Sequence, residues 1–519
     1  MEFTPGTKIS LMYGNSAEII RKLGKGGQGI VYEVKIDGKP YALKWYTNEK
    51  IIHNTNFKKN LKNNIQKGSP DKRFLWPLYL TDDVDGSYGY IMDLRPQEYS
   101  KFPAILNNRA KFTNDEIIIL AALNIVTVFR ILHNDGSSYQ DLNDGSFFIN
   151  VNTGDVLVCD NDNVTPGDKQ NSGGVKGKLF YMAPEVVTGG HPSILSDCHS
   201  LAVVLFKLFI RHDPFMGIAD DGDTSDEVLY GTHPVFIFDP KDTSNRPYPD
   251  YKNPLLLWPR KPRLLQEAFE KSFTSGLKNP GERLTELEWQ KVLIKLRDEC
   301  ILCPTKSCNK TTLHEENGSI ACKDCGNIYK PPSRLFVGEY SIPLFQGKRL
   351  YACHTVNLNT DYTTITGKVV KSKNAPYNLG IQNLTDDIWT FTWPDGKTDN
   401  ITKGNVIPIG VGVEISFKGV TGKIALRLVI DNKSMPLYRG QKLFAKQTRQ
   451  NYSDSKLVTG KVVMNKNTPG ILGLQNLTDD IWTFTWPDGK NEQIAKNGVI
   501  PIGIDVKITF SGITGIITR

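Results

Sequence analysis

Residues 23–32 read Leu23-Gly24-Lys25-Gly26-Gly27-Gln28-Gly29-Ile30-Val31-Tyr32, and Tyr41-Ala42-Leu43-Lys44 follows about one strand later. A G-x-G-x-x-G pattern alone is a weak signal, because dinucleotide-binding folds and ordinary turns also contain it. Here apolar residues alternate around and beyond the glycines, at Ile30, Tyr32 and Val34. A period of two is typical of a β-strand, so we expect the glycines to join two strands of a hairpin.

Further landmarks follow this hairpin in a fixed order. They are Tyr139-Gln140-Asp141, Val158-Cys159-Asp160-Asn161-Asp162, Met182-Ala183-Pro184-Glu185, Ser196-Asp197 opening an apolar helix at 201–210, and Arg283. Asp160 comes 160 − 141 = 19 residues after Asp141. Together the landmarks resemble the protein kinase family, whose members carry His-Arg-Asp, Asp-Phe-Gly and Ala-Pro-Glu in this order. The resemblance implies a bilobal α+β protein-kinase fold.

The resemblance also implies roles for individual residues. Asp141 is expected to be the catalytic base, Lys44 to pair with the α- and β-phosphates of ATP, and Asp160 to hold Mg²⁺ or Mn²⁺. The cofactor-binding set predicted in this way is Gly24, Gly26, Gly27, Gly29, Val31, Ala42, Lys44, Met92, Asp93, Leu94, Ser146 and Asp160. In this set the glycines cover the phosphates, Val31 and Ala42 lie over the adenine, and Met92 to Leu94 form the hinge.

Several positions depart from the kinase pattern. Ser146 and Asn143 stand where the catalytic-loop Asn and Lys belong, and Gln140 replaces the Arg. The segment expected to form helix C, 56–67, holds no Glu, so Lys44 is left to phosphate or Asp160. Each missing contact costs about 1 to a few kcal/mol of transition-state stabilisation. Two interpretations therefore stay open: a slow or partner-activated kinase, which we favour, and an ATP-binding scaffold without catalysis.

Five of the eight cysteines lie within one short segment. Cys303 and Cys308 form one pair and Cys322 and Cys325 a second, separated by 13 residues. Two thiolate pairs at such spacing suit a closed, tetrahedral, structural Zn²⁺ site, so a zinc ribbon is predicted at 300–330. Two alternatives remain, in which Cys300 or His314 supplies one ligand.

An exact repeat occupies the rest of the chain. The segment 383–397 recurs unchanged at 476–490, an offset of 476 − 383 = 93 residues. The same offset relates Gly367-Lys-Val-Val to Gly460-Lys-Val-Val. Within the repeat Trp389, Phe391 and Trp393 alternate with threonines before a Pro-Asp-Gly turn, which predicts a strand. Two tandem all-β, sandwich-like domains are expected, with the aromatic residues in their cores. Such modules usually bind a partner.

Composition agrees with several globular domains. We expect a kinase domain at 1–299, the ribbon at 300–330, and β-domains at 331–427 and 428–519. A net charge of +8 over 519 residues favours a solvated surface over a nucleic-acid footprint. The apolar run at 117–132 is broken by polar residues and predicts a buried helix rather than a membrane span. A polar start and clustered thiols favour a cytoplasmic protein.

Longer motifs narrow the resemblance. Residues 74–77, 159–164, 200–206 and 234–240 are similar to bacterial serine/threonine kinases of the TerY-type phosphorylation triad. In that triad a kinase, a von Willebrand A protein and a PP2C-type phosphatase are encoded together. The resemblance covers about residues 15–330 and implies phosphorylation of Ser/Thr in partner proteins. It also implies signalling with the other two components, in a stress or defence operon associated with tellurite resistance.

Overall fold

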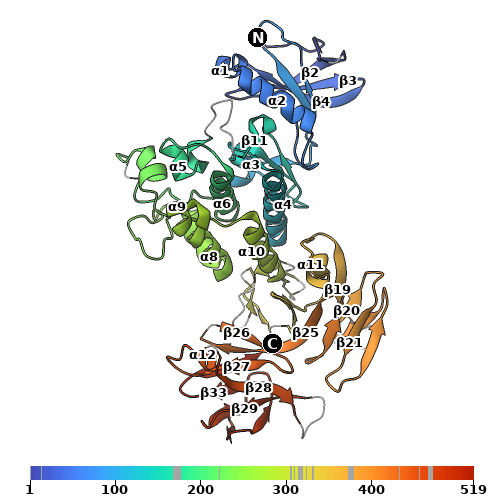
Figure 1. The fold of residues 1–519 in the computed structure, drawn as a ribbon, viewed down its shortest axis with the longest axis vertical. Helices are drawn as coiled ribbons and strands as arrows, with labels where there is room; N and C mark the ends of the chain where they lie inside the picture. Colours follow the sequence, from blue (N-terminus) through green and yellow to red (C-terminus); the bar gives the residue numbers. More distant parts are fainter. Residues whose placement is uncertain are drawn as a thin grey trace. The chain divides into compact units, whose positions relative to one another are not determined.

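The computed structural model describes residues 2–12, 14–167, 177–220, 222–303, 305, 307–308, 310–313, 320–322, 324–329, 332–371, 379–431, 433–454, 456–465 and 471–519 (Figure 1). Two compact units divide the chain, Met1–Arg297 and Asp298–Arg519. His314, one of the alternative metal ligands, lies outside the described residues, as does the segment 168–176.

The first unit begins with an antiparallel sheet of six strands in the order β1-β2-β3-β4-β6-β5. The strands are β1 Lys8–Ser10, β2 Ser16–Lys25, β3 Gly29–Ile36, β4 Lys39–Tyr46, β5 Tyr79–Leu80 and β6 Gly89–Asp93. Ile30, Tyr32 and Val34 point into the core of this sheet, as their alternation predicts. The glycine-rich segment joins β2 to β3, so the predicted hairpin is confirmed.

Two helices follow β4, α1 Glu49–Ile52 and α2 Thr55–Lys67. The side chain of Asn54 caps α2 by accepting a hydrogen bond from the backbone N–H of Phe57. Phe57 and Leu61 lie one turn apart on the buried face of α2 and pack against Tyr46 and Tyr90 of the sheet. Apolar packing on this face therefore holds the helix to the sheet.

The remainder of the first unit is mostly helical (Figure 1). Its helices are α3 Phe102–Leu106, α4 Asp115–Asn134, α5 Pro184–Val187, α6 Ile194–Ile210, α7 Lys252–Leu257, α8 Arg263–Ser272, α9 Ser275–Lys278 and α10 Glu286–Asp298. Short strands carry the chain between them: β7 Ser100–Lys101, β8 Ser137–Ser138, β9 Phe147–Ile149, β10 Val156–Val158 and β11 Thr165–Pro166. By length and composition alone α4 could cross a membrane, but 56% of its apolar window is buried inside the protein.

The second unit begins with two small hairpins that carry the clustered cysteines. The first pairs β12 Cys300–Leu302 with β13 Thr311–Leu313, and the second pairs β14 Ile320–Ala321 with β15 Ile328–Tyr329. Cys303 and Cys322 each follow the first strand of their hairpin. Both donate a backbone N–H across the hairpin, to the carbonyls of Lys310 and Asn327, at 2.8 and 2.9 Å. The two pairs of cysteines therefore lie in matching turns.

Each repeat then forms two sheets. In the first repeat β18 Arg349–Tyr351, β19 Ile365–Lys371, β20 Leu379–Asn383 and β23 Val406–Pro408 form a four-stranded sheet. In the second repeat β27 Lys442–Phe444, β28 Val458–Met464, β29 Leu472–Asn476 and β32 Val499–Pro501 form its counterpart. Single-turn helices, α11 Ala352–Thr355 and α12 Ala445–Thr448, follow the first strand of these sheets.

The other sheet of each repeat belongs to one larger sheet of eleven strands. Its strands are β16 Arg334–Val337, β17 Tyr340–Pro343, β21 Trp389–Thr392, β22 Thr398–Ile401, β24 Glu414–Ser416, β25 Thr421–Ile430, β26 Lys433–Leu437, β30 Trp482–Thr485, β31 Asn491–Ile494, β33 Lys507–Thr509 and β34 Thr514–Thr518. The C-terminal region is therefore rich in β-strands, as predicted.

One strand, β25, serves both repeats. Its first half, Gly422 to Ala425, pairs with β16 of the first repeat. Its second half, Arg427 to Ile430, pairs with β34 of the second repeat. The boundary expected at 427/428 thus falls inside a continuous strand, and no linker separates the two repeats. The two modules pack as a pair that shares its central strand.

The repeated aromatic residues lie in the cores, as predicted. Trp389 packs edge-on against Phe417, and Trp482 packs in the same way against Phe510, with ring centroids 4.8 Å apart in both repeats. The repeated Asn383 and Asn476 are also buried, and each binds backbone groups of its own turn through its amide. The identity of the repeated segment therefore has a structural cause at these positions.

Candidate active site

Lys44 stands at the centre of the candidate site. It lies on β4, and its side chain is buried, so its ammonium group needs acceptors inside the protein. Nζ lies 3.1 Å from Asp160 Oδ1, 2.9 Å from Asp162 Oδ2 and 2.6 Å from Gln28 Oε1. Burial alone would lower the pKa of Lys44, but the two carboxylates outweigh it and raise that pKa. Lys44 is therefore a firmly held cation.

A backbone hydrogen bond closes the glycine-rich turn between β2 and β3. The backbone N–H of Gly26 donates to the carbonyl of Gly29 at 2.8 Å. A Cβ atom added at Gly24, Gly26 or Gly27 would meet no protein atom, so open space lies beside these three residues. Gly29 is different, because a Cβ there would collide with the backbone carbonyl of Trp45. Gly29 is therefore required by the pairing of β3 with β4, in addition to its predicted role at the phosphates.

Asp141 lies in the loop between β8 and β9. Burial and the nearby carboxylate of Asp160 raise the pKa of Asp141 to about 6. Asn143 donates from Nδ2 to Asp141 Oδ1 at 3.0 Å and to the Asp141 carbonyl at 2.9 Å, which fixes the orientation of the carboxylate. The structure therefore brings Asp141, Asp160 and Lys44 into one electrostatically coupled site.

The loop that holds Asp141 is anchored from α6. The carboxylate of Asp197 accepts the backbone N–H groups of Tyr139 and Gln140 at 2.6 and 2.9 Å. Gln140 has a positive φ of 69°, and its side chain donates to Ser138 Oγ and Thr165 Oγ1 at 2.8 and 2.7 Å. Thr165 belongs to β11, which pairs with β8. A neutral amide therefore ties the catalytic loop to the segment after Asp162.

Asp160 follows β10 in a left-handed conformation, with φ of 56°. This turn leaves its side chain 48% exposed, so its carboxylate is accessible to a cation. The next residue, Asn161, donates from Nδ2 to the carbonyls of Leu75 and Val158 at 2.9 and 3.0 Å. Asn161 stands at the position of the Phe in the Asp-Phe-Gly sequence of many kinases. It holds this segment by hydrogen bonds to the backbone.

The remaining predicted cofactor residues lie in two places. Val31, Ala42, Met92 and Leu94 belong to one apolar cluster, which Phe148 and Leu157 of the helical lobe complete. Apolar side chains of this kind are the ones that line adenine-binding sites. Asp93 is exposed at the end of β6.

Ser146 is buried within the catalytic loop. Its hydroxyl accepts the backbone N–H of Asn143 at 3.1 Å and lies 3.3 Å from the carbonyl of Asp141. These contacts form a capping box for the short helix 144–146. The Ser146 hydroxyl therefore has a local role in the loop.

The residues of this site fit ATP and a hard divalent cation. Carboxylate oxygens are the ligands that Mg²⁺ prefers, and Asp160 offers an accessible one. The open space beside Gly24, Gly26 and Gly27 lets backbone N–H groups approach phosphate oxygens. Lys44 supplies the matching cation.

Asp162, Tyr46 and Gln28 belong to the site, although the sequence predicted no defined role for them. Asp162 is fully buried and binds both Lys44 and the hydroxyl of Tyr46, the latter at 2.6 Å. Gln28, at the tip of the glycine turn, accepts from Lys44. Two features of the sequence indicate a role for Asp162. It is a second Asp close to Asp160, and residues 56–67 offer no acidic partner for Lys44.

An ion pair typical of the helical lobe is also present. Arg283 is buried, and its guanidinium forms a bidentate ion pair with the carboxylate of Glu185, with both nitrogen–oxygen distances at 2.7 Å. It also donates to the carbonyls of Gly276 and Leu195 at 2.9 and 2.8 Å. Arg283 thus pairs with the carboxylate of the Met182-Ala183-Pro184-Glu185 sequence.

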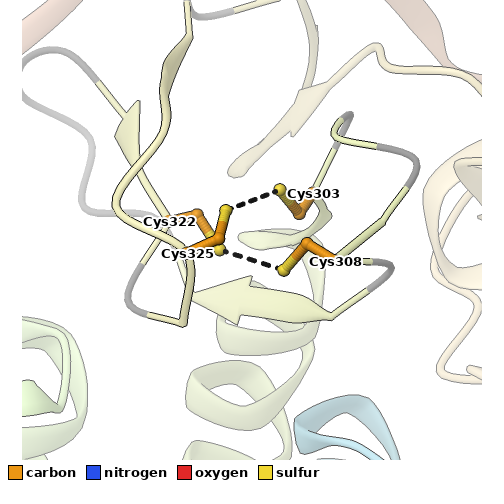
Figure 2. A group of neighbouring side chains, drawn as sticks. All are labelled: Cys303, Cys308, Cys322 and Cys325. Atoms are coloured by element: carbon orange, nitrogen blue, oxygen red, sulfur yellow. Dashed lines mark hydrogen bonds between the residues drawn. The ribbon is translucent and has the colours of Figure 1, made fainter.

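A candidate metal centre lies in the second unit. The four thiol sulfurs of Cys303, Cys308, Cys322 and Cys325 lie within 4.8 Å of one another (Figure 2). Two sulfur–sulfur distances, Cys303 to Cys325 and Cys308 to Cys322, are 3.7 Å. Four sulfurs placed about 2.3 Å from a zinc ion at tetrahedral corners stand about 3.8 Å apart, so the donor set fits Zn²⁺.

Cys300 does not join this cluster. It begins β12, pairs in register with Leu313, and is buried there. Among the residues that the structure describes, the four other thiols gather without it.

Comparison with known proteins agrees with this geometry. Residues 17–253 match the family model of the protein kinase domain. The chain is 26% identical over 269 residues to serine/threonine-protein kinase OXI1 of Arabidopsis thaliana, covering 39% of this chain and 63% of OXI1. It is 26% identical over 281 residues to the DNA damage-responsive serine/threonine-protein kinase RqkA of Deinococcus radiodurans, covering 50% of this chain and 38% of RqkA.

Both relatives are covered over less than two thirds of their length. A solved structure of the Mycobacterium tuberculosis PknI kinase domain, a double mutant, aligns with a TM-score of 0.38 and 15% identity. The alignment covers 56% of this chain and 98% of that chain. The family match and the site geometry lead to the same conclusion: the N-terminal part of this chain is a protein kinase domain, and it is similar to serine/threonine kinases.

Proposed function

We propose that this protein transfers the γ-phosphoryl group of ATP to Ser/Thr hydroxyls of partner proteins, with Mg²⁺ or Mn²⁺. The observation that best supports the proposal is the meeting of three charged side chains from separate segments. Lys44 Nζ lies 3.1 Å from Asp160 Oδ1, and the charge of Asp160 helps to raise the pKa of Asp141 to about 6. A lysine and two aspartates in this arrangement are the groups that protein kinases use to bind ATP with its metal and to orient the substrate hydroxyl.

Each residue has a role in this proposal. ATP and its metal supply the phosphoryl group and neutralise its charge. Lys44 and the glycine turn bind and orient the phosphates, and Asp160 holds the metal. Asp141, oriented by Asn143, accepts the proton of the substrate hydroxyl at its carboxylate. With a pKa near 6, this carboxylate is ionised at neutral pH and is more basic than an ordinary Asp.

A second candidate function is an ATP-binding scaffold. One observation favours it: the hydroxyl of Ser146 is engaged in the capping box of its own loop, where kinases place a metal-binding Asn. Weak metal binding would slow phosphoryl transfer without abolishing ATP binding. This scaffold would act by recruiting partners through the C-terminal unit.

The proposed partners follow from the resemblance to the TerY-type triad. They are a von Willebrand A protein and a PP2C-type phosphatase in a cytoplasmic bacterial signalling or stress-defence pathway. The paired β-modules are proposed to bind such a partner.

We also propose that Cys303, Cys308, Cys322 and Cys325 bind a structural Zn²⁺ and that residues 300–330 form a zinc ribbon. The sulfur spacing supports this assignment. So does Gly326, whose φ of 71° and N–H bond to the Cys322 carbonyl at 2.8 Å form a tight turn around the second pair. With four protein ligands, the zinc would have no open position for catalysis.

Label transfer tests the catalytic proposal. The purified full chain is incubated with Mg²⁺ and γ-labelled ATP, alone and with each proposed partner, and the labelled amino acid is identified. Label on Ser or Thr, absent with K44M, supports the proposal. If no partner accepts label while ATP still raises the melting temperature of the protein, the scaffold function replaces it.

A further inference from the structure

Helix α2 carries no acidic residue, although a lysine in the position of Lys44 usually pairs with a Glu from this helix. The helix is attached to the site in another way. The side-chain amides of Asn60 and Asn64 both donate to the carbonyl of Val164, at 2.8 and 2.9 Å. Helix α2 thus contacts the segment after Asp160 through neutral groups, and the partner of Lys44 must come from elsewhere.

Asp162 has the geometry of that partner. Its two oxygens lie 3.1 and 2.9 Å from Lys44 Nζ, so it binds the ammonium with both. The hydroxyl of Tyr46 donates to Asp162 Oδ2 at 2.6 Å. The side chain of Asp162 is 0% exposed, whereas that of Asp160 is 48% exposed. The two carboxylates around Lys44 therefore have different surroundings.

This difference in exposure assigns different roles to the two carboxylates. A metal ligand must be accessible to the ion, which Asp160 is. A buried carboxylate is strongly unfavourable without a partner, so Asp162 and Lys44 depend on each other. With two carboxylates around one ammonium, the group carries a net negative charge that also suits a divalent cation at Asp160.

The backbone explains how Asp162 reaches this position. The left-handed turn at Asp160 starts a short helix over Asn161–Asn163, and from this helix the side chain of Asp162 reaches Lys44 and Tyr46. Asn161 fixes that helix through its bonds to Leu75 and Val158. Asp162 is thus built into the same rigid segment as the metal ligand.

We propose that Asp162 is a positioning residue that holds Lys44 for nucleotide binding, in place of an acidic residue on helix α2. This inference rests on the proposed function, because it assigns Lys44 to the phosphates. As a consequence, Lys44 stays oriented without a charged contact to α2. The segment that carries the metal ligand Asp160 also carries Asp162, which orients Lys44.

A double-mutant cycle tests this role in the full chain. The variants are D162N, which is nearly isosteric, K44M, and K44M with D162N. Affinity for ATP with Mg²⁺ is measured by calorimetric titration, and thermal melting is measured without nucleotide. D162N alone is expected to weaken ATP binding about ten- to a hundred-fold, since a charge-assisted contact to Lys44 is lost.

The cycle separates a positioning role from a merely structural one. If Asp162 acts through Lys44, D162N has no further effect on ATP affinity in the K44M background. K44M alone leaves Asp162 buried without its cation, so the double variant is expected to melt at a higher temperature than K44M. D135N serves as control, because Asp135 forms a surface pair with Lys67, and it should leave both measurements unchanged.

The following outcomes would overturn the inference. They are equal loss of ATP affinity from D162N in both backgrounds, unchanged affinity in D162N alone, or a double variant that melts no higher than K44M. If D162N alone does not melt cooperatively, the double variant decides: recovery of folding supports the pair, and failure overturns it. ATP binding can be measured without phosphoryl transfer. A wild-type protein that binds ATP but transfers no label would therefore contradict the proposed kinase function and leave this inference intact.

Discussion

Asp141 and Asp160 carry the same functional group but differ in their surroundings. Asp141 is partly buried, and its desolvation together with the nearby carboxylate of Asp160 raises its pKa to about 6, while the neighbouring Asn143 moderates that shift. Asp160 is half exposed and pairs directly with Lys44. One aspartate is therefore suited to accept a proton near neutral pH, and the other to bind a metal.

The raised pKa predicts a pH dependence for phosphoryl transfer. Asp141 must be ionised to accept a proton, so kcat should fall about ten-fold for each pH unit below about 6 and level off above about pH 7. The measurement is kcat at saturating ATP from about pH 5 to about pH 8. N143A removes the hydrogen bond that favours the ionised form, so its profile should move to higher pH.

A profile that stays flat through about pH 6, with the protein folded throughout, would contradict the role of Asp141 as base. D83N is a suitable control, because Asp83 is exposed and pairs at the surface with Lys58.

At the scale of elements, a buried histidine joins three helices. His133, near the end of α4, lies 3.2 Å from Asp197 of α6 and 2.7 Å from Glu286 of α10. Burial lowers the pKa of His133, but hydrogen bonds to the two carboxylates outweigh it and raise that pKa to about 9. Asp197 also accepts a backbone N–H of the catalytic loop, so protonated His133 stabilises the loop indirectly through Asp197.

This pair of contacts predicts a loss of stability in alkali. The pKa in the folded protein lies above the unfolded value of about 6.5, so the stabilisation is fully present below about pH 6.5. It declines as the pH rises and is lost above about pH 9. Urea unfolding over this range should show a decrease on the order of 1–3 kcal/mol, which H133Q should remove. An equal decrease in H133Q would contradict this assignment.

The cysteine hairpins predict a second result at this scale. Removal of zinc with a chelator should destabilise the second unit by about 3 kcal/mol or more, because ligand binding and folding of small zinc sites are coupled. Metal analysis should find stoichiometric zinc in the wild type and in C300S, and none bound tightly in C308S. Loss of zinc in C300S with retention in C308S would assign the site to the alternative set, in which Cys300 replaces Cys308.

The sequence predicted some of these elements well and others poorly, for physical reasons. Lys44 and the glycine turn are close in sequence and carry local patterns, so both were predicted. The role of Asp162 depends on a left-handed turn at Asp160 and on burial between lobes, and neither leaves a periodic pattern. The need for Gly29 arises from Trp45 on the next strand, which no spacing reveals.

At the scale of the whole molecule, the C-terminal unit is one body made from two copies. The offset of 93 residues suggests a cut at 427/428, but β25 runs through that point and pairs with both copies. Arg427, buried on this strand, donates to the carbonyl of Arg519 at 3.0 and 2.8 Å. A repeat boundary in sequence therefore does not coincide with a boundary between folded units.

This sharing predicts how truncated proteins behave. A fragment of residues 431–519 lacks the strand that pairs with β26 and β34, so it should not melt cooperatively. A fragment of residues 421–519 retains β25 and is the matched control, expected to gain a cooperative transition. Calorimetry compares the two. A sharp transition at the same temperature in both fragments would show that β25 is dispensable.

The central claim is that Lys44, Asp141 and Asp160 act together on ATP, and one paired measurement tests it most directly. ATP affinity and phosphoryl transfer are measured for the full chain and for D141N. We predict that D141N binds ATP as the wild type does, within about three-fold, but transfers phosphate at least about a hundred-fold more slowly. Equal transfer rates in the two proteins would contradict the claim.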